Sequence, residues 1–226
     1  MASSPTGDRS TMRLDVWHDI ACAHCYYGSA NLVRALDTLA DIVAVEVRWR
    51  SFQLDPRPDA ARLVGVRPPT LFEYLASFNG SVEAARAAAA RVAVRARASG
   101  LEFRPDLVKP YNTADAHRLM HIAANEGRGT EMVLRLHREY WADGADLSDT
   151  QTLATIAASV GLDAQRTTTM LAADAYRDAV AADREAASAA GIFGVPTAVI
   201  DSRFMLQPTM DPGDMRDEIL RYLRRG

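Results

Sequence analysis

The chain's two cysteines, Cys22 and Cys25, are separated by two residues and lie where a strand is expected to turn into a helix. The preceding run, residues 14–20, alternates apolar and polar side chains as a half-buried strand does. The residues that follow put apolar side chains on one helical face, namely Leu32, Val33, Leu36, Leu39 and Ala40. Because residues three apart on a helix are neighbours, the two sulfur atoms are expected within reach of a disulfide bond. This placement indicates a redox-active dithiol.

The two cysteines are expected to have different roles. A disulfide between them closes so small a loop that it removes little entropy from the unfolded chain, so a structural staple is a poor explanation. At a helix start, free N–H groups and the positive end of the dipole favour a thiolate on Cys22. We therefore expect Cys22 to form the mixed disulfide and Cys25 to attack it and release the partner. His24 is expected to donate to the thiolate or to lie beside it as a cation.

Two other interpretations of the pair stay open: a zinc site, and two inert thiols. Zinc in a structural site needs four ligands, and the chain has no second cysteine pair to supply them. His117 and His121 are four residues apart and could ligate a metal, but no third ligand is evident, so we expect no metal. His18 is expected either to tune Cys22 or to pack, and His137 to lie on the surface.

Composition and charge limit the binding partners and the cellular location that can be expected. The chain has 226 residues and a formal net charge of −3, which gives no reason to expect nucleic acid or an anionic membrane as a partner. Residues 1–11 are polar and lack the apolar core of a signal peptide, and no apolar run is long enough to cross a bilayer. We therefore expect a cytoplasmic protein, a setting in which a cysteine pair is more often catalytic than structural.

The order of expected elements defines the fold. A second alternating strand covers residues 42–50 and completes a β-α-β opening. Near the C-terminus, residues 197–200 and 204–206 are expected to form a hairpin through 201–203, followed by a helix from Pro212. The expected helices between them cover residues 71–79, 82–99, 112–127, 129–142 and 148–160, with two more starting at Asp163 and Asp174. Asn112 is expected to cap the third.

This pattern predicts an α/β protein with a thioredoxin fold and a large, all-helical insertion. The β-α-β and β-β-α halves of the thioredoxin-fold domain are assigned to residues 12–56 and 191–226. The helical insertion domain is assigned to residues 57–190. Residues 1–11 are expected to be a disordered leader.

Four motifs, in order, resemble those of the DsbA-like thioredoxin superfamily and, within it, the cytosolic frenolicin-biosynthesis-type (FrnE-like) oxidoreductases. They are Asp15–Asp19 leading into Cys22–Gly28, then Trp49–Pro56, Asn112–Leu119 and Gly194–Thr197. The resemblance implies a cis bond between Val195 and Pro196, facing the cysteines, where the backbone of Val195 pairs with an extended substrate. An ordinary trans proline that opens a strand is the alternative. The resemblance also implies that Asn112 and His117 contribute to substrate binding.

Two segments depart from that family's pattern. Ala23-His24 stands where these proteins typically have Pro-Trp, and a histidine at this position is more similar to the periplasmic oxidase DsbA. Residues 205–208 read Met-Leu-Gln-Pro instead of the usual Ser-Gly-Ala-Gln. The chemistry of the site and of its pocket is therefore expected to differ from that of typical members.

The expected function is thiol–disulfide exchange, as an oxidoreductase or isomerase, on a disulfide-containing protein or a small thiol. The protein would be recycled by glutathione or thioredoxin, with no metal or organic cofactor; glutathione is a candidate co-substrate. One alternative is a glutathione-dependent isomerase of the 2-hydroxychromene-2-carboxylate (kappa-transferase) type, which uses a serine where Cys22 stands and needs no Cys25. The other is an accessory protein of polyketide biosynthesis with idle cysteines.

Overall fold

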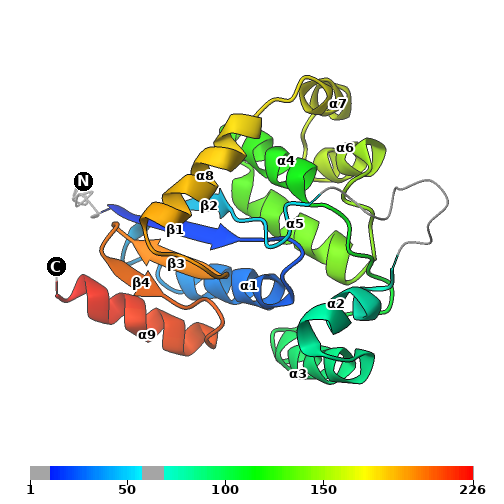
Figure 1. Cartoon of the computed structure of the whole chain (residues 1–226). Coiled ribbons are helices and arrows are strands. Elements are labelled where there is room, and N and C mark those ends of the chain that lie inside the picture. The colour runs from blue at the N-terminus through cyan, green and yellow to red at the C-terminus, as the bar shows by residue number, and fades with distance from the viewer. Residues whose placement is uncertain (1–10, 58–68, 226) are drawn as a thin grey trace.

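The computed structural model describes residues 11–57 and 69–225 (Figure 1). Within them, four strands form one mixed sheet in the order β2-β1-β3-β4. The strands are β1 (Thr11–His18), β2 (Ala44–Ser51), β3 (Thr197–Ile200) and β4 (Phe204–Leu206). β1 is parallel to β2 and antiparallel to β3, and β3 is antiparallel to β4. Helix α1 (Ala23–Asp37) connects β1 to β2, and α9 (Pro212–Leu223) follows β4. The predicted thioredoxin fold is confirmed.

The helices between the two halves of the sheet match the predicted insertion closely. They are α2 (Leu71–Asn79), α3 (Val82–Ala98), α4 (Ala114–Asn125), α5 (Gly129–Trp141), α6 (Thr150–Ser159), α7 (Ala164–Ala172) and α8 (Arg177–Ala189). Side chains at their starts explain the agreement. The Thr70 hydroxyl accepts a hydrogen bond from the Glu73 N–H, and the Glu73 carboxylate accepts one from the Thr70 N–H, which forms a capping box. The side chains that cap α3, α6 and α7 are Ser81, Asp149 and Asp163.

Two helix starts differ from the prediction. The N-cap of α4 is Thr113 and not Asn112, although the Asn112 side-chain oxygen accepts a hydrogen bond from the Ala114 N–H at 2.8 Å. Helix α8 begins at Arg177 and not at Asp174, because Asp174 and Tyr176 both have a positive φ and form a turn before the helix. The predicted start at Asp174 is therefore wrong by about one turn.

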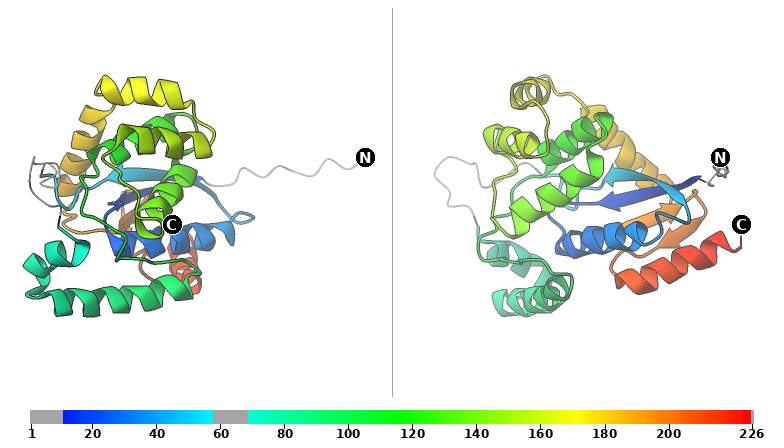
Figure 2. Two further views of the ribbon diagram at one scale, coloured as in Figure 1. Left: turned by 90° about the vertical axis from the view of Figure 1, so that its right-hand side faces the viewer. Right: turned by 180° about the vertical axis from the view of Figure 1, so that it is seen from behind.

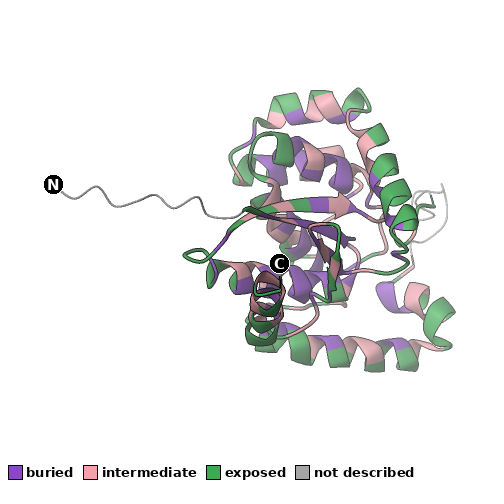
Figure 3. Cartoon of the chain, turned by 90° about the vertical axis from the view of Figure 1, so that its left-hand side faces the viewer, coloured by how far each residue is buried: buried purple, intermediate pink, exposed green. Residues whose placement is uncertain are grey.

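Alternation along β1 divides the side chains between the two faces of the sheet. Met12, Leu14 and Val16 join the main hydrophobic core with α1 and α9. Asp15 and Trp17 point to the opposite face, which α8 covers (Figure 2). Buried residues gather where the helices meet the sheet, and the outer faces of α3 and α7 are largely exposed (Figure 3).

The insertion helices and the sheet share one core. The cluster that contains Leu14 also contains Leu119 and Met120 of α4 and Leu136 of α5. Residues 1–10 of the expected leader and residues 58–68 of the expected insertion lie outside the described residues, and Thr11 is the first residue of β1. Among the described residues, no helix is long and apolar enough to span a membrane.

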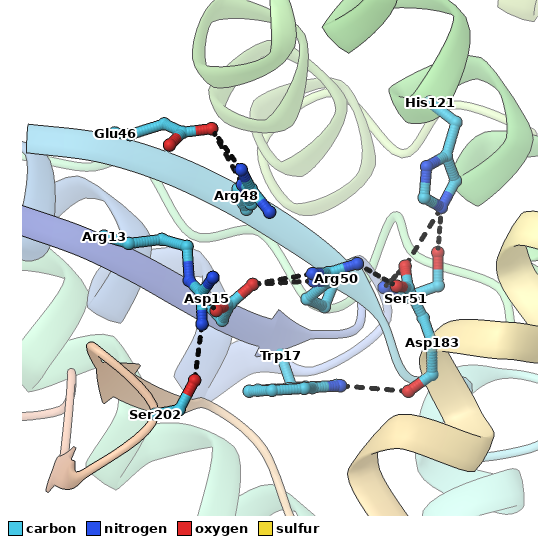
Figure 4. Close-up of polar contacts among 10 residues, drawn as sticks. All are labelled: Arg13, Asp15, Trp17, Glu46, Arg48, Arg50, Ser51, His121, Asp183 and Ser202. Carbon is cyan, nitrogen blue, oxygen red and sulfur yellow. Dashed lines mark hydrogen bonds and ion pairs between the residues drawn. The ribbon is translucent and has the colours of Figure 1, made fainter.

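A polar network joins α8 to the sheet (Figure 4). The Arg50 guanidinium donates to the carboxylate of Asp183 at 2.9 Å and to that of Asp15 at 2.8 Å. The indole N–H of Trp17 donates to the backbone oxygen of Asp183 at 3.0 Å. Both carboxylates are nearly buried, so Arg50 neutralises charge that would otherwise be costly at this interface.

Candidate dithiol active site

The cysteine motif forms the first turn of α1. Cys22 is the N-cap residue, with φ −86° and ψ 111°, and its backbone oxygen accepts a hydrogen bond from the Tyr26 N–H at 3.1 Å. Its own N–H donates to the backbone oxygen of Asp19 at 3.1 Å. Cys22 is 7% exposed and Cys25 is fully buried. Both cysteines are therefore buried, Cys22 less deeply than Cys25, and no disulfide bond joins them.

The loop before β3 faces this turn. The Val195–Pro196 peptide bond is cis, as the resemblance implied. The Cys22 Sγ lies 3.7 Å from the backbone oxygen of Val195. The loop is held in place because the Thr197 hydroxyl donates to the Gly194 oxygen at 2.8 Å and Thr197 begins β3, where it pairs with β1. Residues about 170 positions apart in the chain thus meet at one sulfur atom.

Gly28, one turn into α1, makes this approach possible. A Cβ atom at Gly28 would lie 3.1 Å from the backbone oxygen of Pro208 and 3.3 Å from the Cγ of Pro196. These distances are shorter than ordinary van der Waals contact. A side chain here would therefore press against the cis-proline loop and the segment after β4.

The electrostatics of the turn distinguish the two thiols. A hydrogen bond from Cys25 lowers the pKa of Cys22 to about 6, against the opposing effect of burial, and His24 adds a second hydrogen bond. Burial and the neighbouring Cys22 raise the pKa of Cys25 well above its ordinary value. The hydrogen bond between His24 and Cys22 raises the pKa of His24. At neutral pH the arrangement favours a thiolate at Cys22 and a thiol at Cys25.

Asp19 supports the turn from inside the protein. Its Oδ1 accepts hydrogen bonds from the Ala21 N–H at 3.1 Å and the Thr113 hydroxyl at 3.0 Å, and its Oδ2 accepts one from the Leu54 N–H at 2.8 Å. The Nε2 of His117 lies 3.3 Å from Oδ1. Burial raises the pKa of Asp19, but the hydrogen bond from His117 and the N–H donors outweigh burial, so the pKa is lowered. The buried carboxylate thus fastens the start of α4 and the segment after β2 to the cysteine turn.

His117 and Asn112, which were expected to bind substrate, both make hydrogen bonds within the protein. His117 is fully buried, so it supports the turn through Asp19 and does not line an open groove. The Asn112 side chain donates to the Arg57 oxygen at 2.6 Å and accepts the Ala114 N–H. The structure places His117 beneath the cysteine turn and the partly exposed Asn112 at the start of α4, and their roles in substrate binding stay predictions.

The expectation that His137 lies on the surface is wrong, because His137 is fully buried. It falls on the same face of α5 as Val133, Leu136 and Tyr140, which are also buried. Burial lowers its pKa to about 3. The apolar stripe along this helix was the sequence signal that could have revealed it, because positions 133 and 137 are one turn apart.

His18 is buried beneath the turn as well. Its Nε2 lies 3.0 Å from the sulfur of Met120, and its ring meets that of Trp49 edge-on at 5.3 Å. Burial, together with the neighbouring His137 and His117, lowers its pKa well below the ordinary value. The packing alternative is the one that the contacts of His18 support.

His121 belongs to the network under α8. Its Nε2 lies 3.0 Å from the Ser51 hydroxyl and 3.1 Å from the carboxylate of Asp183. In a catalytic serine–histidine–aspartate triad, the serine and the aspartate contact different nitrogens of the histidine ring, whereas here both contact Nε2. Ser51 is also only 1% exposed, so these three residues do not form such a triad. His121 therefore has a structural role. In the described part of the chain, no group of three or more potential ligands is arranged to hold a metal ion.

Tyr27 connects the turn to α3. Its ring centroid lies 5.9 Å from that of His24 and 5.8 Å from the guanidinium carbon of Arg95. The same guanidinium donates to the backbone oxygen of Thr209 at 2.7 Å. Arg95 thus joins α3, the cysteine turn and the segment between β4 and α9.

A pocket of about 390 Å³ opens beside the dithiol. Its lining comes from the turn (His24), the segment between α8 and β3 (Gly191–Thr197) and the segment around β4 (Met205, Gln207 and Thr209). Phe193 is 84% exposed and Met205 is 51% exposed. Sequence analysis marked 205–208 as unusual but missed Phe193, whose only local signal is its position between two glycines.

Comparison with known proteins agrees with this geometry. The structure is similar to the crystal structure of a probable DsbA oxidoreductase from Streptomyces coelicolor, with 32% identity, a TM-score of 0.82, and coverage of 93% of this chain and 89% of that one. It also resembles a 2-hydroxychromene-2-carboxylate isomerase, with 16% identity, a TM-score of 0.70, and coverage of 94% and 97%. A cytosolic disulfide reductase from Pseudomonas aeruginosa, solved with glutathione, has 19% identity, a TM-score of 0.67, and coverage of 94% and 99%. The last two similarities concern the fold.

The family assignment rests on most of the chain. Residues 13–220 match the family described as the DSBA-like thioredoxin domain. This range starts in β1, ends in α9, and includes both the cysteine turn and the cis-proline loop. The chain belongs to the DSBA-like thioredoxin domain family.

Proposed function

We propose that this protein catalyses thiol–disulfide exchange through Cys22 and Cys25. The observation that carries the proposal is the position of the Cys22 sulfur, 3.7 Å from the Val195 oxygen at the edge of the pocket, with Cys25 buried behind it. An attacking thiol must be ionised and within reach of its substrate. Cys22 has a pKa of about 6, and at 7% exposed it is the less deeply buried of the two thiols.

The proposed reaction has two displacements. In the first, the Cys22 thiolate attacks one sulfur of the substrate disulfide, and the other substrate sulfur leaves as a thiolate and takes a proton from solvent. In the second, Cys25 loses its proton to solvent and attacks the Cys22 sulfur. The second substrate thiolate leaves, and a Cys22–Cys25 disulfide remains. Two electrons pass from the protein to the substrate, and the reverse sequence oxidises a substrate dithiol.

His24 and the cis-proline loop have supporting roles in this proposal. His24 stabilises the Cys22 thiolate by a hydrogen bond. A larger fraction of Cys22 is then ionised and able to attack the substrate disulfide, and Cys22 is also a better leaving group when another thiolate attacks the sulfur bonded to it. The backbone of Val195 positions an extended substrate segment, in the manner of strand addition. We assign the chain to the frenolicin-biosynthesis-type subgroup as part of the same proposal, on the motifs named above.

Glutathione or a thioredoxin is the proposed recycling partner, and the cytoplasm is the proposed setting. The P. aeruginosa neighbour, a cytosolic disulfide reductase solved with glutathione, supports this choice at the level of the fold. The isomerase alternative is supported by the fold of the hydroxychromene-carboxylate enzyme alone. Such an isomerase has no use for a second thiol, so Cys25 favours disulfide exchange.

A pair of serine variants tests the proposal. Wild-type protein should restore activity to a scrambled, disulfide-bonded protein in a glutathione buffer, and Cys22→Ser should reduce this to the uncatalysed rate. Cys25→Ser should accumulate a covalent adduct that runs as a larger species on a non-reducing gel and is released by dithiothreitol. Full turnover by Cys22→Ser, or absence of any adduct with Cys25→Ser, would contradict the proposal.

A further inference from the structure

We propose that Phe193 and Met205 bind an apolar side chain next to the reacting cysteine in an extended segment of an oxidised protein. This inference rests on the proposed function and specifies the substrate of the same site. It assigns substrate selection to two side chains that flank the dithiol and do not take part in the chemistry.

The exposure of Phe193 is imposed by the fold. On one side, Ile192 is only 3% exposed and is buried in the small cluster that contains Trp17 and Ala187. On the other side, Val195 is held against the Cys22 sulfur. Anchors on both sides fix the loop, so Phe193 remains in solvent at 84% exposure as part of the pocket lining. An exposed aromatic side chain in the lining of a pocket that also includes His24 and Val195 is typical of a binding site.

Met205 supplies a second apolar surface in the same pocket. On β4, Leu206 is turned into the core and is 2% exposed, so alternation along the strand directs Met205 outward. Met205 pairs with Val199 of β3, which fixes its backbone relative to the cis-proline loop. A methionine side chain adapts its shape to different apolar groups. The pair therefore suits a range of apolar side chains rather than one residue type.

The charge of the pocket favours a polypeptide segment over free glutathione. Among the described residues that line the pocket, His24 is the sole ionisable side chain. Glutathione carries two carboxylates and one ammonium group, and His24 can pair with only one of the carboxylates, so the other two charged groups lose hydration on binding without gaining a partner of opposite charge in the lining. A cysteine within a protein chain has neutral peptide groups on both sides, and the backbone of Val195 can pair with these.

The reach of an extended substrate matches this arrangement. The Cys22 sulfur, to which a substrate sulfur would be bonded in the mixed disulfide, lies 3.7 Å from the Val195 oxygen. An extended chain advances about 3.3 Å per residue, and successive side chains point to opposite sides. A residue next to the substrate cysteine therefore reaches the mouth of the pocket, whose volume of about 390 Å³ is at the small end of the range for ligand sites.

Two matched peptides test the inference. Each carries one cysteine as a mixed disulfide with a coloured aromatic thiol, and they differ only in the residue next to the cysteine, which is leucine in one and serine in the other. Reduced wild-type protein should release the chromophore with a kcat/KM about tenfold higher for the leucine peptide, the discrimination typical of an apolar pocket. Phe193→Ser and Met205→Ser should each lower this ratio, the double variant should bring it near one, and Phe193→Leu should largely retain it.

Phe78→Ser is the matched control. Phe78 lies on α2, is 66% exposed and lies outside the pocket lining, so its replacement should leave the peptide ratio at the wild-type value. A wild-type ratio near one, or an equal loss for both peptides in Phe193→Ser, would overturn the inference while leaving disulfide exchange intact. Failure of wild-type protein to react with either peptide would instead contradict the proposed function.

Discussion

The carboxylate of Asp183 on α8 lies 2.9 Å from the guanidinium of Arg50 on β2. The same carboxylate accepts the backbone N–H of Ser51 at 2.8 Å. One side chain thereby joins the last helix of the insertion to the strand next to β1. The cis-proline loop follows α8 directly, so this contact helps to set where the loop meets the cysteine turn.

Replacement of Asp183 by Asn should lower the free energy of unfolding by about 2 kcal/mol at pH 7, the usual cost of disrupting a buried, charge-assisted hydrogen bond. Burial raises the pKa of Asp183, but hydrogen bonds from His121 and Ser51 outweigh burial and lower it overall. The stabilisation is therefore complete above the unfolded pKa near 3.9 and is lost as pH falls through the lower folded value. Urea denaturation should show the difference from wild type shrinking below pH 4.

Glu46→Gln is the control for this experiment. Glu46 pairs with Arg48 on the same sheet face, but both side chains are about half exposed, so the change in unfolding free energy should stay below about 0.5 kcal/mol. An Asp183→Asn effect as small as that of Glu46→Gln would contradict the structural role of Asp183.

Ionisation of Cys22 should control reactivity. The rate at which iodoacetamide alkylates the reduced protein should rise with pH around a midpoint near 6, because that is the pKa of Cys22 in the fold. An ordinary thiol titrates near 8.5. Cys22→Ser should remove this phase and leave the buried Cys25 slow throughout. A midpoint above 8 would show that the turn does not stabilise the thiolate.

Replacement of His24 by Ala should raise the pKa of Cys22, because the variant loses a hydrogen bond that favours the thiolate. The alkylation midpoint should shift upward, and the reduction potential should become more negative because the reduced form is less stable. His24 is exposed, so solvent screens the contact and the shift in potential should be about 10–30 mV. Equilibration with glutathione buffers measures it; a shift toward more oxidising values would be the wrong sign.

Gly28→Ala should impair exchange. Alanine favours a helix over glycine by about 0.5–1 kcal/mol, but its Cβ would meet the Pro208 oxygen at 3.1 Å and displace the cis-proline loop. We expect kcat/KM to fall several-fold. Gly213→Ala in α9 is the control, because its Cβ would meet nothing within 4 Å. Equal kcat/KM in the two variants would contradict a role for close packing at Gly28.

Much of the fold could be predicted because its signals are local. Alternation identified β2, and the segment 197–206 matched the β-hairpin, whose turn residues Asp201 and Ser202 adopt positive φ. The start of α8 could not be predicted in this way. Its preceding turn places the non-glycine residues Asp174 and Tyr176 at positive φ, so the usual signal for such a conformation is missing.

The centre of the site was predictable, but its surroundings were not. The spacing of Cys22 and Cys25 and the resemblance around Pro196 identified the turn and the loop. The hydrogen bond of His117 to Asp19 and the outward position of Phe193 depend on contacts between segments about 100 or more residues apart. No local sequence pattern predicts whether a histidine lines a substrate groove or is buried beneath it.

The pairing of β3 with β1 has a consequence for the order of events during translation. Translation adds Val195 173 residues after Cys22. At about 5–20 residues per second, the interval is on the order of 10–35 s. Throughout it, the nascent protein carries two cysteines without the strand that completes their surroundings. The proposed exchange can therefore begin only after the residues of β3 have been released and have paired with β1.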